Sequence, residues 1–175
     1  NHIRAEASAG RMFSRLMAIV LEGERERVYV SPNQLHQNAA DVPCPSNPPN
    51  GELKGKAKVN VGLYGFKSFH QLFSDRQLTA IMSLSDMLDE VRNEVLSDID
   101  DRHDSEEYAD FVVTYMAMAI GKAVDYWSTI CSWHNSREIM RNTFGRQAIP
   151  MTWDYTEANP FSESTGNWAA CLAWG

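Results

Sequence analysis

Two residues with metal-ligand chemistry stand close together in the sequence. Cys131 and His134 have the Cys-x-x-His spacing of half a zinc site, whose other half would have to come from Cys171, His103 or a carboxylate. Nucleophilic catalysis by the same pair would need a base within hydrogen-bond reach and an oxyanion hole, and no flanking motif predicts either. We therefore predict no metal site, and interpret the pair as a partly buried thiol beside a surface imidazole.

The tripeptide Asn159-Pro160-Phe161 is comparable with the Asn/Asp-Pro-Pro-aromatic motif of amino-group methyltransferases. In that motif the Asn or Asp side chain and a backbone carbonyl accept hydrogen bonds from the target amine, and the aromatic ring stacks on the flipped base. One proline of the motif is missing here. We interpret the stretch as a turn, with a catalytic motif as the minority alternative, and we assign no catalytic residue in this chain.

A group of residues suited to nucleic-acid contact follows the Cys-x-x-His pair. Arginine and side-chain amides bind guanine and adenine edges with two hydrogen bonds, and arginine also grips phosphate. The alternative is that these arginines pair with carboxylates of an acidic helix. The group consists of Arg137, Arg141, Asn142, Arg146 and Gln147.

Three lysines, Lys54, Lys56 and Lys58, alternate within residues 41–62, a stretch that holds four of the 7 prolines. This composition favours a Pro/Gly-rich loop or linker. The lysines are interpreted as solubilising the linker; alternatively, a flexible lysine cluster can follow a phosphate backbone without reading bases.

Charge is unevenly distributed along the chain. The 175 residues carry 16 basic and 23 acidic side chains, a net charge of −7. Residues 1–67 have a net charge of +3, whereas residues 86–110 hold 11 acidic and 2 basic side chains. A free-standing nucleic-acid binder is usually basic, so any DNA track must lie away from this acidic stretch. We interpret the stretch as a solvated face or, alternatively, as an acidic docking surface.

Composition excludes several classes of protein. With 43% hydrophobic residues a sizeable core can form. Three cysteines, an odd number, and no recognisable signal peptide favour a reducing, cytoplasmic location over a secreted disulfide scaffold. The longest uncharged apolar stretch, residues 111–121, is far shorter than the roughly 20 residues of a bilayer span, so we predict no membrane partner.

The elements that must position these residues are predicted to be mainly helical. A β-hairpin is predicted over residues 16–30, and Ser31-Pro32 is a good start for a short helix ending near Ala40. Apolar steps of three and four predict one amphipathic helix over 75–99, and a second is predicted over 105–131 after a polar break at 100–104.

We expect these two helices to pack antiparallel as the core. The face of the second helix that is expected to be buried consists of Phe111, Val112, Tyr115, Met116, Ala119, Ile120, Ala123 and Trp127.

The last part of the chain, residues 133–175, is aromatic and rich in turns. A short helix is predicted from Ser136 through Phe144, ended by Gly145, and another near Asn167. The predicted fold class is therefore mainly α with a small β-hairpin (α+β). Its divisions are 1–40 (hairpin and short helix), 41–62 (loop or linker) and 63–175 (helical module with the aromatic segment).

Several segments together carry a family resemblance by their order and spacing. The most specific one spans residues 141–162 and includes Trp153, Asp154, Asn159, Pro160 and Phe161. The others are the hairpin ending Arg27-Val28-Tyr29-Val30-Ser31-Pro32, Tyr64-Gly65-Phe66, Phe73 through Leu78, and Tyr126 through His134.

This pattern resembles the middle of the adenine-specific DNA methylases that carry a zinc ribbon, large prokaryotic S-adenosylmethionine-dependent enzymes. In that family the segment that binds the methyl donor lies upstream and the Asp-Pro-Pro-Tyr catalytic motif lies downstream, and this chain has neither. The chain also lacks a Cys-x-x-Cys pair, so the ribbon is not encoded here.

The resemblance implies an internal, non-catalytic segment of a longer enzyme, which fits a chain beginning Asn1-His2-Ile3 without an initiator Met. S-adenosylmethionine would bind to the parent enzyme and not to this segment. The implied partners are DNA, through the parent, and the remainder of the methylase. The alternative is a helical protein–protein interaction module with no nucleic-acid role, and a stand-alone hydrolase is a distant third.

Overall fold

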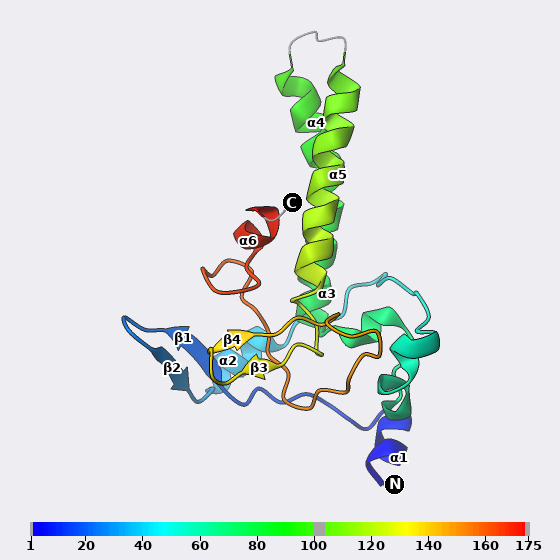
Figure 1. The fold of residues 1–175 in the computed structure, drawn as a ribbon, viewed down its shortest axis with the longest axis vertical. Helices are drawn as coiled ribbons and strands as arrows, with labels where there is room; N and C mark the ends of the chain where they lie inside the picture. Colours follow the sequence, from blue (N-terminus) through cyan, green and yellow to red (C-terminus); the bar gives the residue numbers. More distant parts are fainter. Residues whose placement is uncertain (1, 100–103, 174–175) are drawn as a thin grey trace.

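The computed structural model describes residues 2–99 and 104–173, and it confirms a mainly helical α+β fold (Figure 1). The first half holds α1 (His2–Ser8), the antiparallel hairpin of β1 (Ile19–Glu22) and β2 (Arg27–Val30), α2 (Gln34–Ala40), and the 3-10 helices η1 (Gly55–Lys58), η2 (Val61–Tyr64) and η3 (Phe69–Leu72). The second half holds α3 (Asp75–Asp86), α4 (Leu88–Asp98), α5 (Ser105–Val124), a hairpin of β3 (Trp133–His134) and β4 (Ile139–Met140), and α6 (Trp168–Ala173).

The two long helices form an arm that projects from the rest of the chain (Figure 1). The predicted helix 75–99 is present as α3 and α4, which bend at Met87, where ψ is −9° instead of the helical value near −42°. α5 returns antiparallel beside them, as predicted. The predicted polar break lies, except for Asp104, outside the described residues. No helix in the described ranges is long and apolar enough to cross a bilayer.

The predicted burial of α5 is only partly right. Ala119, Ile120 and Ala123 are buried as predicted, and Ala109 is buried as well, because small side chains let the neighbouring helices approach closely. Phe111 and Tyr115 were expected on the same face but are exposed. The apolar residues of α5 extend around more of its circumference than α3, α4 and α6 can cover.

Most buried side chains lie where the arm meets the rest of the fold. One cluster consists of Leu53, Val61, Leu72, Ile130 and Ile149. Because Leu53 and Val61 are fully buried, the loop 41–62 contributes to this core and is not a linker between separate units. A second cluster joins α3, α5 and α6 through Ala80, Ala123, Trp127, Trp168 and Cys171.

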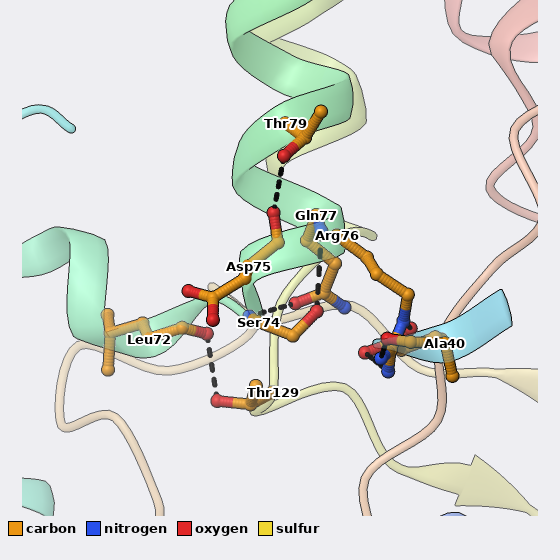
Figure 2. A network of polar contacts seen from close by, with 9 residues as sticks. Ala40, Leu72, Ser74, Asp75, Arg76, Gln77, Thr79 and Thr129 are labelled. Carbon is orange, nitrogen blue, oxygen red and sulfur yellow. Dashed lines mark hydrogen bonds and ion pairs between the residues drawn. The ribbon is translucent and has the colours of Figure 1, made fainter. Parts of the chain in front are cut away.

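The start of α3 is the junction of several distant segments (Figure 2). The Ser74 side chain accepts a hydrogen bond from the Gln77 backbone N–H, so α3 begins with a capping box. Arg76 donates to the carbonyl of Ala40, at the end of α2, and forms two hydrogen bonds with Glu157, at 2.9 and 3.0 Å. Thr129 donates from its backbone and its hydroxyl to the carbonyl of Leu72.

Three local predictions are wrong. α2 begins at Gln34, because Asn33 and His36 exchange side-chain-to-backbone hydrogen bonds in a capping box. α5 ends at Val124 and not at residue 131, since the Asp125 carboxylate accepts hydrogen bonds from a loop. In place of the predicted helix 136–144 there is the β3–β4 hairpin, whose turn places Glu138 at a φ of 49°.

Replacing Arg76 with alanine should destabilise the fold by about 2 kcal/mol, between the values typical of exposed and buried ion pairs. The substitution leaves the half-buried Glu157 carboxylate and the Ala40 carbonyl without their partner. Urea unfolding followed by circular dichroism measures the change, and a double-mutant cycle with Glu157→Ala isolates the pair. The matched control is Arg11→Ala, which breaks an exposed pair with Glu6. An equal loss of stability in both variants would contradict this role for Arg76.

Candidate nucleic-acid interface

The loop after β4 carries two of the three candidate arginines and is anchored to the end of α5. The Asp125 carboxylate accepts hydrogen bonds from the Asn142 amide, at 3.0 Å, and the Phe144 backbone N–H, at 2.8 Å. The Asp125 carbonyl accepts from the backbone and hydroxyl of Thr143. Thr143 is buried against Ser128, at 2.7 Å between their hydroxyl oxygens. The loop therefore has a defined position on the helical core.

Arg137, Arg141 and Arg146 are all exposed along this part of the chain. Arg137 lies in the turn of the β3–β4 hairpin, and Arg141 directly follows β4, where its N–H donates to the Ser132 carbonyl at 2.8 Å. None of the three forms an ion pair with a carboxylate within residues 2–99 or 104–173. The alternative of pairing with the acidic helix is therefore not seen for the described carboxylates.

The lysines and the arginine loop, far apart in the sequence, meet in the fold. Lys56 donates to the side-chain carbonyl of Gln147 at 2.9 Å. Lys54 and Lys58 lie 3.5 and 3.9 Å from the carboxylate of Glu52, and all three residues are exposed. Exposed ion pairs of this kind contribute about 0–1 kcal/mol, so an incoming phosphate can replace Glu52 at small cost. Asn142 and Gln147 each use one end of the side-chain amide within the protein, so neither offers both ends for a two-bond contact with adenine.

Trp153, one of the residues that carry the family resemblance, packs on the short helix that follows the lysines. The Trp153 ring is 54% exposed and packs edge-on against Tyr64, with 5.1 Å between centroids. The Arg4 guanidinium lies 5.8 Å from the centre of the Tyr64 ring. Tyr64 belongs to η2, as does Gly62. The aliphatic part of the Lys58 side chain packs on Gly62, where a Cβ atom would lie 2.7 Å from the Lys58 Cγ. No local signal predicts that Arg4 would join these residues.

Gly65 allows α1 to pack close to η2, which places Arg4 near the Tyr64 ring. It adopts a φ of +86°, which disfavours any side chain, and a Cβ there would lie 2.9 Å from the carbonyl of Ala7. α1 can therefore pack directly on the end of η2.

The Asn159-Pro160-Phe161 stretch is a turn closed on itself. Asn159 Oδ1 accepts the Phe161 N–H at 3.0 Å, and the Pro160 carbonyl accepts the Trp168 N–H at 2.8 Å. Both acceptors that a target amine would need are engaged. Phe161 is exposed, as is Asp154 beside Trp153.

The Cys131 thiol points away from His134 and into the polar cluster around Thr143. It donates to the Tyr126 carbonyl at 3.1 Å and lies 3.3 Å from the Thr143 hydroxyl, whereas His134 contacts the Ser136 hydroxyl. His103 lies outside the described residues. Within the described part of the chain, no group of three or more His, Cys, Asp or Glu residues could hold a metal ion.

Comparison of the chain with protein-family models, with curated proteins and with solved structures finds no match in any of the three.

Alkylation should distinguish the three cysteines. Cys131 and Cys171 are buried, whereas Cys44 is exposed, and its hydrogen bond to Asp75 raises the pKa of its thiol. Since the thiolate is the nucleophile, iodoacetamide should modify Cys44 first, but slowly for an exposed thiol. The Asp75→Asn variant should react severalfold faster at pH 8, as measured by mass spectrometry of the intact protein. Modification of Cys131 before Cys44 in the folded protein would contradict the structure.

Proposed function

We propose that this chain is an internal, non-catalytic module of an S-adenosylmethionine-dependent, adenine-specific DNA methyltransferase, where it helps to position DNA or to complete the methylase fold. The class of the parent rests on the sequence resemblance, and with it we infer a cytoplasmic location. The reaction of the parent would be methyl transfer to the exocyclic amine of a flipped adenine. DNA contact rests on the surface of this chain.

The observation that carries the DNA-contacting role is the hydrogen bond between Lys56 and Gln147. It joins two cationic segments that lie 91 residues apart into one surface. Phosphate contacts of this kind set register and add affinity without reading sequence. Because Asn142 and Gln147 each have one end of the amide engaged, they support backbone contact over two-bond recognition of adenine.

Exposed Trp153 supports the same role in a second way. Aromatic rings beside cationic side chains are the usual means by which proteins hold unpaired bases, because every base has a stacking face. A methyltransferase that flips a base leaves unpaired nucleotides in the DNA, and an exposed tryptophan packed on Tyr64, with the Arg4 guanidinium near the Tyr64 ring, suits such a strand.

Removing the three arginines should weaken DNA binding. The variant Arg137→Ala/Arg141→Ala/Arg146→Ala is expected to bind a DNA duplex about tenfold or more weakly at about 50 mM salt, because fewer counterions are released. The slope of log affinity against log salt should fall by about three. Fluorescence anisotropy measures both quantities.

The control for this experiment is Arg15→Ala/Arg25→Ala, which removes two exposed arginines outside the proposed surface. It should bind DNA nearly as tightly as the unaltered chain. If the triple variant binds as tightly as the control, the arginine surface is not the DNA contact. If neither protein binds DNA measurably, the result would instead favour the alternative of a protein-interaction module with no nucleic-acid role, whose aromatic interface would depend little on salt.

The isolated chain should not bind S-adenosylmethionine, because the family's donor-binding segment is absent from the sequence. Isothermal titration calorimetry should give only heats of dilution. Saturable binding with a stoichiometry near one would overturn the assignment of the cofactor to the rest of the parent.

A further inference from the structure

An exposed apolar stripe runs along α5. It consists of Tyr108, Phe111, Tyr115 and Met118, which are 58%, 73%, 36% and 67% exposed. Steps of three, four and three residues place all four on one face of the helix. The buried residues Ala109, Ala119 and Ala123 lie on the adjoining face. Four large apolar side chains in one row on a helix form the seam that another helix usually covers.

The fold covers only part of this stripe. The Tyr115 hydroxyl donates to the Leu172 carbonyl at 2.6 Å, so α6 lies beside the middle of α5 (Figure 1). Tyr108 and Phe111 lie beyond this contact, toward the tip of the arm. α6 therefore contacts the middle of the stripe, whereas its end at Tyr108 and Phe111 is uncovered.

Two acidic side chains lie at the open end, and more are exposed on the neighbouring helix of the arm. Asp104 and Glu107 precede Tyr108 and Phe111 by one helical turn each, and both are exposed. On α4, Asp89, Glu90, Glu94 and Asp98 are also exposed. Among the described carboxylates of the arm, only Asp110 forms an ion pair, with Arg92 at 2.7 Å. Asp104 and Glu107 beside the apolar stripe, on an arm with an excess of acidic side chains, match a positively charged occupant.

We propose that the stripe is the docking site for a basic amphipathic helix of a partner protein. Its apolar side chains, spaced by three and four residues, would pack on Phe111 and Met118, and its Lys or Arg side chains would face Asp104 and Glu107. A second copy of this chain is a poorer occupant, because two acidic arms would then face each other and repel. DNA is excluded from this face by the same charge.

The proposal can be tested with the full chain and two synthetic helical peptides of about 18 residues, or five turns. Both carry the same row of leucines, flanked by lysines in one peptide and by glutamates in the other. The lysine peptide should bind saturably and the glutamate peptide at least about tenfold more weakly, as measured by fluorescence anisotropy. The variant Phe111→Ser/Met118→Ser should weaken lysine-peptide binding about tenfold or more.

Two further variants sharpen the test. Thr114→Ser/Ala117→Ser alters exposed positions of α5 outside the stripe and should bind the lysine peptide normally. Asp104→Lys/Glu107→Lys should reduce the preference for lysine over glutamate flanks at least about tenfold. Equal binding of both peptides, or no binding of either, would overturn the proposal. So would a dimer in sedimentation velocity that dissociates in the Phe111→Ser/Met118→Ser variant, since a second copy would then occupy the stripe.

Discussion

The bond between Arg76 and Glu157 is the interaction on which the arrangement of the chain most depends. Arg76 lies in the first turn of α3, Glu157 comes from the C-terminal segment, and the same guanidinium reaches the end of α2 at Ala40. A planar guanidinium can serve three acceptors in fixed directions, so one side chain orients two distant segments against the base of the arm. Because both side chains are half-buried, breaking this ion pair lowers the stability of the fold more than breaking a surface pair does.

The elements predicted well from the sequence are those specified by neighbouring residues. The first hairpin, the bent helix α3–α4 and the start of α6 near Asn167 each follow from local periodicity and capping residues. The β3–β4 hairpin could not be predicted in this way, because Ser136-Arg137-Glu138 resembles a helix start. Its conformation depends on distant contacts, among them the hydrogen bond from Tyr29 to Glu138. Burial of Leu53 likewise follows from packing against Leu72 and Ile149, not from its Pro-rich surroundings.

The candidate interface also combines features that local sequence predicts with features that depend on distant contacts. Residue type alone identified the arginines and lysines, since their charge is visible in the sequence. Their combination into one surface was not predictable, because Lys56 meets Gln147, and Tyr64 meets Trp153, only after the core has formed. The side-chain amides show that residue type does not reveal which groups the fold itself uses. Asn142 has the right chemistry to read adenine, but the fold uses its amide to hold the loop against Asp125.

The separation of charge within the fold gives the net value of −7 a physical meaning. Exposed carboxylates gather on the arm, whereas unpaired arginines lie on the segment that follows α5, so the molecule is polarised. Beyond about 10 Å, salt screens the arm's charge, and phosphates near Arg141 respond mainly to their local surroundings. The negative net charge is therefore compatible with the proposed DNA contact at one end of the chain. If DNA binds there as proposed, repulsion at the arm and attraction at its base would together restrict its orientation.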